Sequence, residues 1–206
     1  MSTLALDDPQ DRARPLCETP SRRAQELADR LERGARLLIL LTTRLTEAQW
    51  RIRLPRDGRT VGLLVHHVAS VYPLEIQLAQ AVAAGQPVMG VTLDDIHQMN
   101  ATHARMYDGV TKAAALDLLR RASAAAARAI RALGGVQVHP VPLGSMYGNA
   151  PVTCQFVLED RAVRHSYQHV ATIEKALKAH DDAFERLKAC VESGLNCRPV
   201  FLRDAS

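Results

Sequence analysis

Apolar residues recur at helical spacing along most of this chain of 206 residues. In the first such run, Leu27, Leu31 and Leu38 are four and seven residues apart, a spacing that places them on one face of an α-helix. Ser21 precedes the run, and serine commonly caps helices. The pattern therefore predicts a helix from Ser21 to about Arg44.

Further runs of the same kind are bounded by residues that start or stop helices. Thr60 begins one run that Gly85 ends, and Thr111 precedes another that stops at Gly134 and Gly135. The last run extends from about Val152 to Ala179, with a short additional helix expected to about Ser193. The helices predicted between these limits cover about residues 60–84, 93–107 and 112–133.

A long loop is predicted between the last two helical runs. The segment from Val136 to Pro151 holds three prolines and two glycines between short apolar pieces. Loops of this length in compact domains are often functional. Because no strand-like alternation accompanies the four main helices and their long crossover, the sequence predicts an all-α four-helix bundle. We expect a mobile tail over residues 1–20, the bundle over 21–193 and a second tail over 194–206.

Composition excludes several classes of function. The net charge is +4 and the arginines are scattered among acidic residues, without the basic run or aromatic platform that nucleic-acid binding needs. No apolar stretch approaches the ~18 residues that span a bilayer, and the N-terminus lacks the apolar segment of a signal peptide. The four cysteines form no C-x-x-C pair. We therefore expect a cytoplasmic protein with neither nucleic acid nor membrane as partner.

Three histidines fall on the apolar faces of two predicted helices. After Thr60, the face that includes His67 consists of Leu64, His67, Val71, Leu74, Leu78 and Val82. The neighbouring His66 is turned about 100° away, which assigns it to the rim. In the last helix, the inward face consists of Cys154, Leu158, Ala162, His165, His169, Ile173 and Ala176.

The spacing of His165 and His169 lets both imidazoles approach one ion, because residues four apart lie on the same helix face. His67, on a facing helix, would supply the third ligand, with its ring nitrogen about 3 to 3.5 Å from those of the other two. The residues alone leave an alternative open, in which a carbonyl, a carboxylate or a water satisfies each buried imidazole separately.

Three separated blocks of sequence resemble the DinB superfamily. Residues 60–69, T-V-G-L-L-V-H-H-V-A, are similar to its S-V-x-x-L-x-x-H-x-A helix, and H-S-Y-Q-H at 165–169 is similar to its closing H-x-x-x-H. The stretch from Asp95 to Ala101 resembles a D-x-x-N-A region of some members, with longer spacing. Relatives in this superfamily include mycothiol-dependent maleylpyruvate isomerases and bacillithiol transferases.

The resemblance implies an up-down-down-up four-helix bundle whose three-histidine site binds a divalent metal, carried here onto His67, His165 and His169. It implies Zn or Ni as the metal, with Fe as the alternative, and a low-molecular-weight thiol as a further cofactor. The function expected from it is metal-dependent transfer or hydrolysis of a small-molecule substrate, a class of reaction that fold alone does not specify.

One alternative function stays open, a non-catalytic bundle that binds a ligand or forms a homodimer, with a structural metal or none.

Four further residues near the histidines have ordinary interpretations. We interpret His103 as an exposed helix residue, Tyr107 and Tyr147 as rim and loop aromatics, and Glu75 as a solvated carboxylate. We also expect substrate to enter beside the loop from Val136 to Pro151, which precedes the helix of His165.

Overall fold

The computed structural model describes residues 21–133, 140–144 and 147–192, and side chains as far as residue 182. The tails predicted over 1–20 and 194–206 lie outside the described residues, as does the stop predicted at Gly134 and Gly135. Part of the predicted loop between Val136 and Pro151 is also outside them. None of the described helices is both long and apolar enough to cross a membrane.

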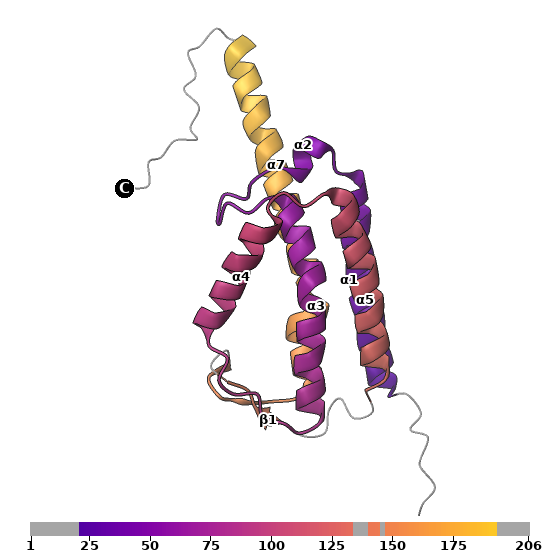
Figure 1. Cartoon of the computed structure of the whole chain (residues 1–206). Helices are drawn as coiled ribbons and strands as arrows, with labels where there is room; N and C mark the ends of the chain where they lie inside the picture. The colour runs from indigo at the N-terminus through magenta and orange to yellow at the C-terminus, as the bar shows by residue number, and fades with distance from the viewer. Residues whose placement is uncertain (1–20, 134–139, 145–146, 193–206) are drawn as a thin grey trace, which may run out of the picture.

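Four long helical segments form the bundle (Figure 1). They are α1 (Arg22–Arg44), α3 (Val61–Ala83), α5 (Lys112–Arg131) and a last segment made of α6 (Cys154–Leu158), the π-helical turn η3 (Glu159–Val163) and α7 (Arg164–Glu192). Around the bundle, α5 packs between α1 and α3, and the last segment closes the ring between α3 and α1. Along the chain the four run up, down, down and up, as predicted.

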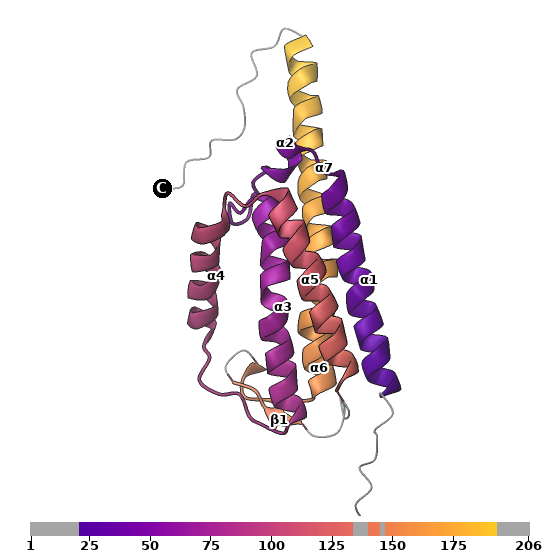
Figure 2. The ribbon, with the colours of Figure 1, turned by 45° about the vertical axis from the view of Figure 1, so that its right-hand side comes forward.

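This topology requires a crossover, because α3 and α5 are neighbours that run in the same direction. The chain returns from the end of α3 to the start of α5 through α4 (Leu93–Tyr107), which stands beside α3 on the outside of the bundle (Figure 2). The one-turn helix α2 (Glu47–Trp50) joins α1 to α3. The predicted helix over 93–107 is therefore present, but it is a connecting helix and not part of the bundle.

Threonine caps explain where several helices begin. The Oγ1 atoms of Thr60, Thr111 and Thr153 accept hydrogen bonds from the backbone N–H three residues later, at 3.0, 3.3 and 3.2 Å. Each bond satisfies one of the N–H groups that the first turn of a helix leaves unpaired. Ser21 directly precedes α1, yet its side chain makes no capping hydrogen bond. The predicted start was correct there for a reason other than the cap.

The last segment differs from its prediction. We expected a helix ending near Ala179 and a separate short one, whereas α7 continues without a break to Glu192. The preceding loop contains a short antiparallel pair, β1 (Val141–Pro142) and β2 (Pro151–Val152), in which Val141 pairs with Val152. Two-residue strands are too short to produce a periodic pattern in the sequence.

The buried face of α3 also differs from the predicted stripe. Every residue from Val61 to Ala69 is buried, and beyond Ala69 the inward side carries Tyr72, Ile76 and Ala79. Leu74, assigned to the core by the pattern, is 46% exposed. The first turns of α3 are covered on all sides, so their apolar residues do not mark one face, and the extrapolated stripe drifts away from the core.

Candidate metal centre

The three predicted histidines lie together in the structure. His67 projects from the second turn of α3 toward α7, where His165 and His169 are one turn apart. Ring centroids are separated by 5.2 Å for His67 and His165, 5.7 Å for His67 and His169, and 4.8 Å for His165 and His169. One ligand atom from each residue lies within 4.8 Å of the others.

Glu75, about two turns beyond His67 on α3, supports this cluster. Its Oε1 accepts a 2.6 Å hydrogen bond from Nδ1–H of His165, and the carboxylate is only 8% exposed. The interpretation of Glu75 as a solvated carboxylate was therefore wrong. A proton held on Nδ1 leaves the Nε2 lone pair of His165 free, which is the arrangement by which carboxylates orient metal-binding histidines.

The surroundings of His67 and His169 disfavour the charged forms of both imidazoles. Burial lowers the pKa of His67 to about 2 and that of His169 to about 3, and the proximity of His165 lowers both further. The positive charge of Arg59, whose guanidinium pairs with Asp57 at 2.7 Å, acts in the same direction on both pKa values. Neutral imidazoles present the lone pairs that a cation requires.

The structure offers a direct test of whether a cation suits these residues. Nδ1 of His169 is buried and has no hydrogen-bond partner among the described residues. Leaving such an atom without a partner costs about 1 to 3 kcal/mol. With His165 fixed by Glu75 and His67 neutral, this donor set fits a divalent metal ion better than three separately hydrogen-bonded imidazoles.

His66 is not at the rim. It is 7% exposed, because α4 covers it. Its Nδ1 lies 2.8 Å from Nε2 of His103, and the Tyr107 ring stacks on it at a centroid distance of 4.2 Å. Burial is the main cause that lowers the pKa values of both His66 and His103. His66 therefore faces α4, while His67 faces the cluster.

His103 lies beside the cluster without joining it. Its ring centroid is 5.6 Å from that of His67. Because His103 is half-buried, the interpretation as an exposed residue was wrong. However, its Nε2 is engaged by His66 and by Ser70 Oγ at 3.1 Å. Within the part of the chain that the structure describes, only His67, His165 and His169 form a group that could hold a metal ion. Three protein ligands would leave coordination positions open, as in catalytic metal sites.

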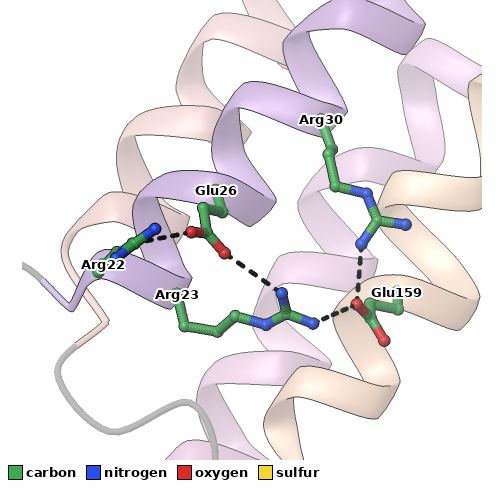
Figure 3. Close-up of polar contacts among 5 residues, drawn as sticks. All are labelled: Arg22, Arg23, Glu26, Arg30 and Glu159. Carbon is green, nitrogen blue, oxygen red and sulfur yellow. Dashed lines mark hydrogen bonds and ion pairs between the residues drawn. The ribbon is translucent and has the colours of Figure 1, made fainter.

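An ion-pair network holds the π turn that precedes His165. Glu159 of η3 receives Nη2 of Arg23 at 2.9 Å and Nη1 of Arg30 at 2.8 Å, both from α1 (Figure 3). Arg23 also contacts Glu26, which in turn contacts Arg22. Single ion pairs at partly exposed positions add little to stability, whereas a network of several charges can contribute. The network joins α1 to η3, the turn that directly precedes the helix of His165 and His169.

The loop before α6 lies toward the opposite end of α3. Gly144 N–H donates to the Val88 carbonyl at 2.9 Å, just beyond the C-terminal end of α3, whereas His67 is near its N-terminal end. Tyr147 donates to Asp160 at 2.7 Å and contacts Phe156, more than one turn before His165. The described part of the loop therefore does not touch the histidines, and substrate entry beside it stays a prediction.

Comparison with known proteins agrees with this architecture. The solved structure of YfiT from Bacillus subtilis, described as a probable metal-dependent hydrolase with an unusual four-helix bundle topology, superposes with a TM-score of 0.61. The two chains share 16% identity over 82% of this chain and 93% of the other, so the match establishes the fold. No curated protein matches the chain by sequence.

The family assignment comes from a sequence model. The model described as mycothiol-S-transferase matches residues 26–170, more than two thirds of the chain. The matched region begins in α1 and ends just after His169, so it includes all three clustered histidines. The chain belongs to the mycothiol-S-transferase family.

Proposed function

We propose that this protein is a metal-dependent thiol S-transferase, in which His67, His165 and His169 hold a divalent cation. The observation that carries the proposal is the convergence of three histidines from two facing helices, with His165 anchored by a buried carboxylate. The membership of the mycothiol-S-transferase family supports a thiol as the co-substrate. A cation at such a site supplies Lewis acidity, which keeps a bound thiol ionised at neutral pH.

The reaction transfers the thiol sulfur to an electrophilic carbon of a small molecule. A sulfur–carbon bond forms as the bond between that carbon and its leaving group breaks, and the thiol proton passes to solvent. The protein's own contribution is to hold and orient. Glu75 fixes the ring of His165, and burial lowers the pKa values of His67 and His169, which favours the neutral forms that bind a cation.

Zinc and nickel are the metals we propose, with iron as the alternative, because imidazole ligands suit all three. Elemental analysis of the untagged protein identifies the metal that is bound. About one equivalent per chain is expected, and a value near zero after growth with each metal would contradict the proposed site.

Substitution of a ligand provides the sharper test. The change His169→Ala should abolish stoichiometric metal binding and leave the helical content intact, since the surrounding apolar residues still pack the bundle. The matched control is His180→Ala, which removes an exposed histidine of the same helix. Metal content is measured by elemental analysis and helical content by circular dichroism. Full metal occupancy in His169→Ala would show that His169 is not a metal ligand.

Activity is tested with mycothiol and a chromogenic aryl halide as electrophile. We expect thiol-dependent turnover that a chelator abolishes and the metal restores. If the aryl halide is unchanged and a panel of esters and amides is cleaved without thiol, the site is hydrolytic. If metal binds and neither panel is turned over, the non-catalytic alternative is the better description.

A further inference from the structure

Helix α4 is held to the rest of the molecule differently from the bundle helices. None of its 15 residues is buried, whereas α1, α3 and α5 each bury many. Three of its large apolar side chains, Leu93, Met99 and Met106, are 53%, 43% and 67% exposed. Hydrophobic burial therefore contributes little to keeping α4 in place, and elements with few buried contacts are those that open locally.

Among the described residues, the side-chain hydrogen bonds between α4 and α3 lie near the C-terminal end of α4. His103 bonds to His66 and Ser70, and Tyr107 stacks on His66. Directly after the helix, Asp108 receives Arg53 at 2.7 and 3.2 Å. Figures 1 and 2 agree that α4 diverges from α3 toward its N-terminal end. The helix is thus attached at one end and separated from α3 at the other.

The hydrogen bonds of His103 are specific to the docked position of α4. Ser70 Oγ donates its only proton to the His67 carbonyl at 2.9 Å, so it must accept from Nε2–H of His103. The same N–H lies 2.8 Å from Nδ1 of His66. Both acceptors belong to α3, and His66 is buried. Movement of α4 away from α3 would leave the ring nitrogen of His66 without this partner.

The position of His103 relates this attachment to the metal centre. Its ring meets the edge of the His67 ring at 5.6 Å, so α4 borders the cluster on the α3 side. We propose that His103 is a positioning residue that latches α4 as a lid beside the three-histidine site, through its hydrogen bond to His66 and Ser70. The kinetic consequence of this latch rests on the proposed transferase function, whereas its effect on α4 does not.

Hydrogen exchange tests the latch in the full chain, without any substrate. The change His103→Ala should speed exchange of the α4 amides about five-fold or more, because loss of the latch populates open states of that helix. Exchange in α1 and α5 should not change. The matched control is His97→Ala, an exposed histidine of the same helix. Equal α4 exchange in His103→Ala and His97→Ala would overturn the proposal.

A conservative variant separates the hydrogen bond from ring packing. His103→Gln keeps an N–H donor in reach of α3 and should restore much of the wild-type protection of α4. Equal loss of protection in His103→Ala and His103→Gln would overturn the hydrogen-bonded latch. The fold of each variant is verified by circular dichroism, and we expect no change because α4 has no buried residue.

Kinetics then relate the latch to the site. With mycothiol and the aryl halide, His103→Ala should raise KM for the electrophile several-fold while the metal content stays at the wild-type level. His97→Ala should leave both unchanged. Loss of metal in His103→Ala would place His103 in the metal centre and overturn its role as a lid residue. If no transfer is detectable in the wild-type protein, the proposed function fails, while the exchange result still decides the latch.

Discussion

Glu75 shows how a buried charge can be tolerated when it has a defined partner. Its carboxylate is 8% exposed, and Oε1 accepts from His165 at 2.6 Å. Oε2 is buried and has no hydrogen-bond partner among the described residues. A buried carboxylate with one oxygen unsatisfied is costly, so its presence indicates a role in holding His165.

Removing the charge of Glu75 should weaken metal binding without unfolding the protein. Glu75→Gln keeps the shape of the side chain, but its amide is a weaker acceptor for Nδ1–H of His165. Loss of such an outer partner typically lowers metal affinity about 10- to 100-fold. Competition with a chromophoric chelator measures the affinity, and Gln77→Ala, an exposed change on the same helix, is the control. Affinity within twofold of wild type would contradict the orienting role.

Individual residues also show where sequence reasoning reached its limit. The periodic pattern correctly predicted that His67, His165 and His169 lie close together, because it placed each of them on the inward face of its helix. Glu75 and His103 were misjudged because the burial of Glu75 depends on α7 and that of His103 depends on α3, and both partner helices are distant in sequence. A pattern within one helix cannot report a partner supplied by another helix, so both looked like ordinary surface residues.

At the scale of elements, the first turns of α3 depend on a close approach of α2. A Cβ placed on Gly62 would lie 2.4 Å from Cε2 of Trp50, far inside van der Waals contact. Trp50 is 4% exposed, and its Nε1–H donates to the Val110 carbonyl at 3.0 Å. The indole therefore ties α2 to Gly62 of α3, about one and a half turns before His67, and to the residues that precede α5.

The change Gly62→Ala should displace Trp50 and destabilise the protein by about 1 to 2 kcal/mol, since overpacking outweighs the gain in helix propensity. Trp50 is the only tryptophan, so its fluorescence reports the displacement directly as a red shift. Gly109→Ala is the control, because a Cβ there meets nothing within 4 Å. Unchanged emission together with an unchanged midpoint of urea unfolding would contradict the predicted displacement of the indole.

Element boundaries were predicted better than element roles. Threonine caps and terminal glycines are local signals, and they placed the ends of α3 and α5 within about two residues. The role of α4 as a crossover outside the bundle follows from α3 and α5 running parallel, which no local pattern contains. The π turn at Glu159–Val163 was likewise not predicted, because it conserves the helical pattern on either side.

At the scale of the whole molecule, the buried imidazoles make stability depend on pH. Burial lowers the pKa of His67 to about 2 and that of His169 to about 3, against a value near 6.5 in the unfolded chain. Below pH ~6.5 the imidazoles of the unfolded chain bind protons that the folded protein does not bind. The contribution of each imidazole to the free energy of unfolding is therefore present in full above that pH and is lost as the pH falls toward about 3.

Acid should therefore destabilise the metal-free protein more than a variant that lacks one of these groups. Between pH 7 and pH 5, each buried imidazole costs the wild type about 2 kcal/mol of unfolding free energy, because the unfolded state alone is protonated over that range. His169→Leu removes one such group and should lose about 2 kcal/mol less than wild type between the two pH values. Urea unfolding of both proteins in a chelator measures the difference, and His180→Leu, an exposed change on α7, should behave as wild type. Equal losses of unfolding free energy in His169→Leu and wild type would mean that His169 is protonated in the folded protein. That result would contradict the neutral form of His169 that cation binding requires.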